Sequence, residues 1–153
     1  MTEPTRVVIV EDDSLVRLDV RAMLEGNGFD VVGEAGAGEA AVELVCSLEP
    51  PPNVVVMDVK LDGIDGVEAS RRIRSRRPVP IVMLTGYGED ELVASAADAG
   101  VYAYLAKPFR EADLMTAIRI ALVRHDELED LNAFRRRVEE VDSAKLFPSY
   151  MKW

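Results

Sequence analysis

Val54-Val55-Val56-Met57-Asp58 is the stretch that decides the fold, because a wholly apolar run ends there in a carboxylate. Three other short apolar segments also end in polar residues that can carry chemistry. They are Val7–Val10 before Glu11-Asp12-Asp13, Ile81–Leu84 before Thr85-Gly86, and Tyr102–Ala106 before Lys107-Pro108. In parallel α/β sheets the carboxyl ends of the strands lie along one edge, where ligands bind. The sequence therefore predicts that acids, a hydroxyl and a lysine meet at one edge of a sheet.

Strand-like and helix-like segments alternate along the chain, which is the pattern of βα units around a parallel sheet. The expected strands lie near 6–10, 30–34, 53–57, 81–84 and 101–105. The expected helices lie at about 15–26, at about 38–48, between the loop 61–66 and the arginines of 71–77, at about 89–99, and from about 110 onward. We predict a flavodoxin-like α/β fold, a (βα)5 doubly wound parallel sheet of order 2-1-3-4-5 with an extended C-terminal helix.

The first expected helix has a candidate cap and a candidate apolar face. Ser14 suits the N-cap position, and the apolar face consists of Leu15, Leu18, Ala22 and Leu24. Acids before a helix can also serve only to stabilise its N-terminus, and Asp13 is expected to do only that. For Glu11 and Asp12 we favour a role in a site, because chemically capable residues recur at the other strand ends.

Composition and charge exclude several classes of function. A net charge of −10 argues against general binding to nucleic acid or to an anionic membrane surface. The N-terminus lacks the apolar core of a signal peptide, and no apolar run is long enough to span a bilayer. We therefore expect a cytoplasmic protein with no membrane partner.

After about residue 124 the sequence becomes highly charged and favours helix. An apolar stripe continues through this segment at steps of three and four residues, formed by Leu128, Leu131, Phe134, Val138 and Val141. It spans less than two heptads, whereas three or more are typical of a coiled coil. We place a domain boundary near 124, with a helical extension and an irregular tail over 125–153. We hypothesise that the helix over 126–141 is an output or dimerisation element.

The residues at the strand ends suit transfer of a phosphoryl group to Asp58. Mg²⁺ prefers oxygen ligands, which Asp12 and Asp58 offer, and Glu11 is placed to act through a water. Crowded acids resist ionising together, and a bound cation removes that penalty. Lys107 supplies a positive charge and Thr85 a hydroxyl for phosphate oxygens.

Together, Glu11-Asp12, Met57-Asp58, Leu84-Thr85-Gly86 and the run Tyr104-Leu105-Ala106-Lys107-Pro108-Phe109 resemble the receiver domains of two-component response regulators. The resemblance covers about residues 5–124. It implies a phosphoacceptor at Asp58, and Mg²⁺ on Asp12, Asp58 and the backbone carbonyl of Lys60, with water-mediated help from Glu11. It also implies a switch in which Thr85 moves toward the phosphoryl group and Tyr104 turns inward.

The resemblance implies a signalling protein whose phosphoryl donor is a histidine kinase or a histidine phosphotransfer protein. Phosphorylation would switch its contacts with other proteins. We expect no turnover enzyme, only an acceptor that assists its own phosphorylation and dephosphorylation. No recognisable DNA-binding or enzymatic segment follows residue 124, and the remaining stretch of about 30 residues is too short for an ordinary output domain.

Three alternatives remain open. Gly33-Glu34-Ala35-Gly36 and Met57-Asp58-Val59-Lys60 look similar to receivers of RNA-binding antiterminators, which carry a helical ANTAR output after a coiled-coil linker. Ser143–Trp153 is far too short for that output, so the chain would be a receiver remnant. A second alternative is a dimerisation module that works without phosphorylation. A third is a small Mg²⁺-dependent phosphatase, which would need a further catalytic acid or base where this chain has Lys60.

One form of dimer is not expected. Relatives that pair through the fourth helix, the fifth strand and the last helix usually carry a basic residue on the fourth helix. Here that helix begins Glu89-Asp90-Glu91 and has no Lys or Arg through Asp98. Self-association, if it occurs, is therefore expected through the extension of the last helix.

Overall fold

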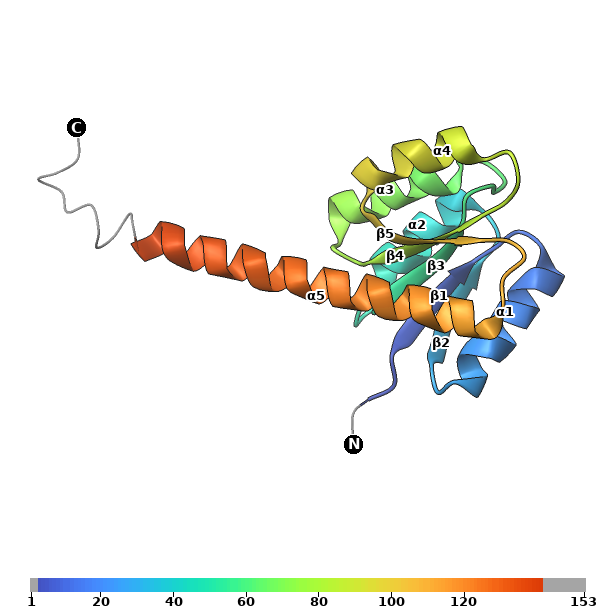
Figure 1. The fold of residues 1–153 in the computed structure, drawn as a ribbon, viewed down its shortest axis with the longest axis horizontal. Helices are drawn as coiled ribbons and strands as arrows, with labels where there is room; N and C mark the ends of the chain where they lie inside the picture. Colours follow the sequence, from blue (N-terminus) through green and yellow to red (C-terminus); the bar gives the residue numbers. More distant parts are fainter. Residues whose placement is uncertain (1–2, 142–153) are drawn as a thin grey trace, which may run out of the picture.

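The computed structural model describes residues 3–141, so the tail predicted at 143–153 lies outside the described residues. Parallel strands form one sheet of order β2-β1-β3-β4-β5, which confirms the predicted fold (Figure 1). The strands are β1 (Arg6–Val10), β2 (Asp30–Ala35), β3 (Val54–Asp58), β4 (Ile81–Thr85) and β5 (Val101–Ala106). The helices are α1 (Ser14–Gly26), α2 (Gly38–Ser47), α3 (Gly66–Arg76), α4 (Asp90–Ser95), the 3-10 segment η1 (Ala96–Ala99) and α5 (Glu111–Val141).

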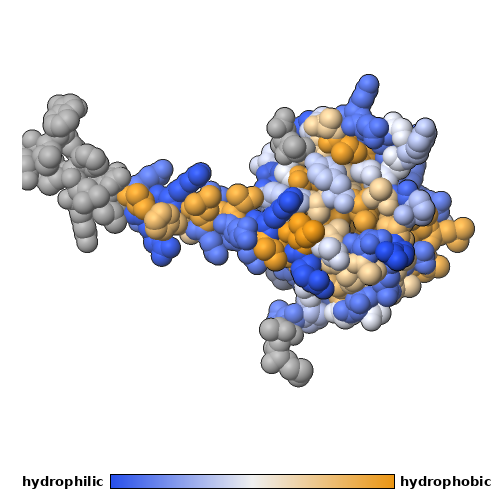
Figure 2. Space-filling model, in the orientation of Figure 1, coloured by the Kyte–Doolittle hydropathy of each residue, from blue (hydrophilic) through white to orange (hydrophobic). Residues whose placement is uncertain are grey.

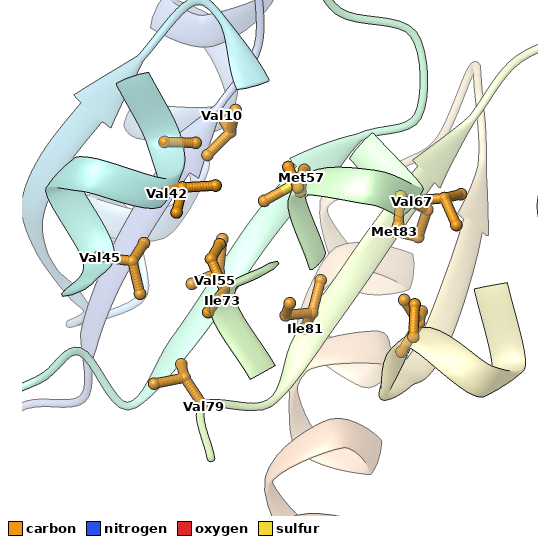
Figure 3. Packing of buried hydrophobic residues seen from close by; sticks show 14 of the residues in the cluster. Val10, Val42, Val45, Val55, Met57, Val67, Ile73, Val79, Ile81 and Met83 are labelled. Atoms are coloured by element: carbon orange, nitrogen blue, oxygen red, sulfur yellow. The ribbon is translucent and has the colours of Figure 1, made fainter. Parts of the chain in front are cut away.

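Helices cover both faces of the sheet, and each face has its own apolar core. Between the sheet and helices α2 and α3, Val55, Met57 and Ile81 pack against Val45 and Ile73 (Figure 3). On the other face, the strands pack against α1 and α5 through a cluster that includes Ile9, Val56, Leu84, Leu24, Leu114 and Ile118. Burial of each large aliphatic side chain stabilises the fold by about 1.5–3 kcal/mol. The two cores hold the carboxyl ends of the strands in fixed relative positions.

Helix α1 differs from the prediction at its cap and on its apolar face. Asp13 is the N-cap, since its Oδ1 accepts hydrogen bonds from the backbone N–H groups of Leu15 (2.9 Å) and Val16 (3.3 Å). Val20 and Leu24 are buried, whereas Leu15 and Leu18 are 76% and 63% exposed. The predicted face was therefore wrong except at Leu24. The packed stripe begins one residue later and follows positions 16, 20 and 24, which have helical spacing too.

The fourth and fifth helices refine the prediction in different ways. The helix expected at 89–99 is a short α4 followed by η1, and Gly100, with φ +82°, ends the segment. Helix α5 runs unbroken past residue 124 and projects from the domain (Figure 1). Its first part packs on the sheet through buried residues such as Ile118, while Leu131 in the projecting part is exposed. Within residues 3–141, no helix combines the length and apolarity that crossing a bilayer requires.

Candidate functional site

Three strand ends bring charged side chains together at the carboxyl edge of the sheet. Asp58 is the last residue of β3 and is 4% exposed, and Glu11, directly after β1, is 1% exposed. Lys107 follows β5. Its Nζ donates to Oδ2 of Asp58 at 2.7 Å and to Oε1 of Glu11 at 3.1 Å. The predicted meeting of acids and lysine is therefore present in the structure.

Asp12 completes an acidic cluster with these two carboxylates. One oxygen from each of Glu11, Asp12 and Asp58 lies within 4.8 Å of the others. In the part of the chain that the structure describes, Oε2 of Glu11 is buried and has no hydrogen-bond partner. An unpaired buried oxygen of this kind costs free energy unless a cation or water satisfies it. An all-oxygen set of carboxylates is the donor type that Mg²⁺ prefers, so these residues fit that ion.

The burial of the cluster changes the protonation of its members. Burial, reinforced by the neighbouring Asp58, raises the pKa of Glu11 from 4.5 to about 8, although Lys107 acts in the opposite direction. Burial alone would lower the pKa of Lys107, but hydrogen bonds and charge from Asp58 and Glu11 outweigh it and raise that pKa. Lys107 is therefore a permanent positive charge in the site.

Thr85 and Tyr104 lie on neighbouring strands but take no part in the contacts between Lys107, Asp58 and Glu11. Thr85 ends β4, and its carbonyl accepts a 2.7 Å hydrogen bond from the backbone N–H of Lys107. Tyr104, in β5, is 39% exposed, and partial burial raises the pKa of its phenol. The inward orientation of Tyr104 that the family resemblance implies is not the one in this structure.

Lys60 lies directly beside the acceptor. Its backbone N–H points to Oδ1 of Asp58 at 3.4 Å, a distance at which the hydrogen bond is weak. Its side chain is exposed. The Oδ1 atom of Asp58 is therefore held much less firmly than Oδ2, which Lys107 binds.

Two features of the site were not predicted from the sequence. The carboxylate of Glu89 accepts a 2.6 Å hydrogen bond from the backbone N–H of Gly86, two residues beyond Leu84, which pairs with Asp58. Gly66 starts α3 against the acceptor strand, where an added Cβ would lie 2.1 Å from the carbonyl oxygen of Asp58. Two sequence signals could have indicated these features. The first is an acid three residues after Gly86, and the second is a glycine after the loop 61–65.

The fold and the site together define a doubly wound α/β protein with an acidic, lysine-bridged site at the carboxyl edge of its sheet. Comparison with known proteins identifies the family. The response regulator receiver domain matches residues 7–119, and the chain belongs to that family. The resemblance found in the sequence is thereby confirmed.

Curated relatives are longer than this chain. It is 47% identical over 128 residues to the transcriptional regulatory protein PdtaR of Mycobacterium tuberculosis H37Rv, covering 84% of this chain and 62% of that protein. It is 43% identical over 115 residues to the response regulator UvrY of Escherichia coli K12, covering 74% of this chain and 52% of that protein. The chain thus spans between about half and three fifths of the length of these relatives.

Solved structures agree with the fold. The signal receiver domain of a modulated diguanylate cyclase from Desulfovibrio desulfuricans G20 superposes with a TM-score of 0.74 at 33% identity, covering 82% of this chain and 98% of that one. A fusion carrying a trimeric coiled coil of yeast Spc42 superposes with a TM-score of 0.74 at 28% identity, covering 92% of this chain and 95% of that one.

Proposed function

We propose that this receiver domain accepts a phosphoryl group on Asp58 in a Mg²⁺-dependent reaction. The observation that carries the proposal is the bond between Lys107 and Asp58 inside a cluster of three carboxylates. A buried aspartate fixed by a lysine, beside oxygen donors for a cation, provides the charge stabilisation and positioning that phosphoryl transfer requires.

The two oxygens of Asp58 have different roles in this proposal. Oδ2 is held by Lys107 at 2.7 Å, whereas Oδ1 has only the long contact with the N–H of Lys60. We assign Oδ1 as the attacking atom. Its electron pair forms the new bond to phosphorus while the bond from phosphorus to the donor breaks, and the donor keeps that electron pair. Lys107 remains charged throughout and offsets negative charge on the acyl phosphate.

Mg²⁺ would be held by Asp12, Asp58 and the backbone carbonyl of Lys60, with Glu11 acting through a water. When bound, the ion offsets the charge that the incoming phosphoryl group adds to three neighbouring acids. The orphaned Oε2 of Glu11 supports this assignment, because a metal-bound water would give that oxygen a partner. Glu11 itself then holds and orients the water rather than touching phosphorus.

The donor is proposed to be a histidine kinase or a histidine phosphotransfer protein, in line with the family. Exposed Leu15 and Leu18 support a protein donor, since they form an apolar patch on α1 directly after Glu11-Asp12-Asp13. Exposed apolar patches with polar rims often mark protein interfaces. A donor seated on this patch would reach Asp58 from the carboxyl edge of the sheet.

A role in transcription is the second candidate, favoured by the 47% identity to PdtaR, which is named a transcriptional regulatory protein. The antiterminator interpretation belongs here, with the chain acting as the receiver part of such a regulator. RNA binding by this chain itself is opposed by the net charge of −10. Measurable RNA affinity at physiological salt would favour it.

Chemical mapping tests the proposed acceptor. Borohydride reduces an acyl phosphate to an alcohol, so protein treated with Mg²⁺, acetyl phosphate and then borohydride should contain homoserine at position 58. Peptide mass spectrometry locates the change, and the peptide containing Asp12 is an internal control exposed to the same reagents. Homoserine at another position, or none in folded protein, would contradict the assignment.

A further inference from the structure

The first turns of helix α5 pack into the core, and an exposed apolar stripe continues along the later part of the helix. Figure 2 shows apolar side chains along the projecting part of the helix. These side chains are between 41% and 57% exposed and comprise Leu128, Leu131, Phe134 and Val138. Ile120 and Val123, on the part of α5 beside the receiver, are 41% and 51% exposed.

Most of the stripe, namely Leu131, Phe134 and Val138, lies on a different side of the helix from the residues that pack on the receiver core. Successive residues turn by about 100°. On this spacing Ile120, Leu131 and Val138 lie along one line, about 100° from the buried Ala121 and about 160° from the buried Ile118. Leu128 lies about 20° from the direction of Ala121. Leu131, Phe134 and Val138 belong to the part of α5 that projects from the domain (Figure 1), so a second helix can approach them without colliding with the receiver.

A projecting helix with this stripe is incomplete by itself. Most helical stability in proteins comes from packing an apolar face rather than from the helix alone. Leu131, Phe134 and Val138 follow the a, d, a spacing of a heptad, with Ile120 in phase at an earlier d position. Arg124 and Glu127 occupy the a and d positions between them, so the apolar seam of a and d positions extends from Leu131 onward.

The residues at the e and g positions, which flank the seam, indicate that the partner helix is a second copy of this chain. In a parallel pair in register, a g position faces the e position five residues later on the other helix, and these pairs set partner and orientation. Asp130 at g then faces the partner's Arg135 at e, and Val123 at g faces the partner's Leu128 at e. Both cross-pairs match in kind, one by opposite charge and one by apolar contact. Because a homodimer has twofold symmetry, each of these two contacts forms twice in the interface.

The antiparallel arrangement that pairs Phe134 with the partner's Val138 is worse for the same side chains. Pairing Phe134 with the partner's Val138 places the centre of an antiparallel dimer at Arg136. Arg135 and Arg137 would then each lie beside their own counterparts, and like charges in such positions are destabilising. In this register the charges therefore favour the parallel pair.

We propose that two copies of this chain pair in parallel through the α5 stripe, with Asp130 of each copy bonded to the partner's Arg135. The interface places both receiver domains at the same end of the paired helices. Because the seam is short, the dimer forms reversibly and depends on protein concentration. Pairing requires no phosphoryl group, so it stands or falls independently of the proposed acceptor at Asp58.

Sedimentation equilibrium of the full chain tests the pairing. Wild type should shift from monomer to dimer over a hundred-fold range of concentration. Leu131→Asp puts a charge into the seam and should weaken association at least ten-fold. Asn132→Asp adds the same charge at the neighbouring exposed position off the seam and should leave it within two-fold of wild type. Circular dichroism confirms that each variant keeps its helix.

Charge exchange tests the orientation. Asp130→Arg and Arg135→Asp should each weaken the dimer at least three-fold, and the double variant should recover to within two-fold of wild type. Recovery supports the parallel pair. A monomeric wild type at every concentration, a dimer that Leu131→Asp leaves intact, a larger assembly, or a double variant no better than the singles would each overturn the proposal.

Discussion

Lys107 reaches across a whole strand to bind Asp58: the two residues lie at the ends of β5 and β3, with β4 between them, yet Nζ and Oδ2 are 2.7 Å apart. The same Nζ also binds Glu11 at the end of β1. One side chain thus links three of the strand ends at this edge. The proposed chemistry and the stability of the site both depend on this link.

Replacing Lys107 should damage transfer and stability together. Lys107→Met leaves two buried carboxylates without their cation, so we expect unfolding free energy to fall by about 1–3 kcal/mol. The rate of phosphorylation by acetyl phosphate should fall at least ten-fold, measured by intact mass against time. Arg110→Met removes a positive charge from an 87% exposed side chain and is the matched control. A Lys107→Met protein that transfers like this control would disprove the role of Lys107.

Stability without divalent cations should decrease as the pH rises. The pKa of Glu11 is about 8 in the folded protein and 4.5 when unfolded, so the folded state holds more protons between those values. The contribution of Glu11 is fully present below about pH 4.5 and is lost progressively toward pH 8, at no more than about 1.4 kcal/mol per pH unit. Urea unfolding in EDTA across this range measures the loss.

Two comparisons attribute that loss to Glu11. Glu11→Gln cannot ionise, so its stability should depend less on pH over the same window. Mg²⁺ should restore more stability at pH 8 than at pH 5, because it favours the ionised carboxylates. An unchanged slope in Glu11→Gln would show that another group causes the pH dependence.

Removing the Glu89 carboxylate should favour phosphorylation. The Glu89 carboxylate accepts a hydrogen bond from the backbone N–H of Gly86, close to the acceptor. It also adds negative charge where an anionic phosphoryl group must bind. Glu89→Ala should raise the rate of phosphorylation by roughly three- to ten-fold, the equivalent of about 1 kcal/mol. Glu91→Ala removes an exposed acid from the same helix and should change the rate less than two-fold. Equal rates in the two variants would exclude competition for the Gly86 amide.

Gly66 is needed for the close approach of α3 to the acceptor strand. A methyl group there would lie 2.1 Å from the carbonyl oxygen of Asp58, so the backbone must shift. Gly66→Ala should lower unfolding free energy by about 1–3 kcal/mol and slow phosphorylation. Gly26→Ala, where nothing lies within 4 Å of the added carbon, should change stability by less than about 1 kcal/mol. Equal urea midpoints for both variants would contradict this account.

The α1 patch should matter for a protein donor and not for a small one. Leu15→Ser with Leu18→Ser removes exposed apolar side chains, so folding should be preserved. Transfer from a histidine kinase that phosphorylates wild type should fall at least five-fold, while phosphorylation by acetyl phosphate should stay the same. A loss with both donors would point to damage of the site, and no loss with either would exclude the patch.

The fold was predictable because four of its five strands are mainly apolar runs, and the site was predictable because each of those four runs ends in a chemical group. Helix α1 was harder, since Leu15 and Leu18 and the set Val16, Val20 and Leu24 both have helical spacing. Only packing on the sheet distinguishes them. The bond from Gly86 to Glu89 depends on the path of a loop, which residue types alone do not specify. The boundary near 124, the cytoplasmic location and the absence of enzymatic turnover stay predictions.

The central claim is that Asp58 accepts a phosphoryl group with the help of Mg²⁺. The most direct measurement is the intact mass of the full chain after incubation with acetyl phosphate, with Mg²⁺ or with EDTA, for wild type and Asp58→Asn. The account predicts a single phosphoryl addition to wild type with Mg²⁺, and none in EDTA or in the variant. Folded wild type that gains no mass, or a variant that gains the same mass, would contradict it.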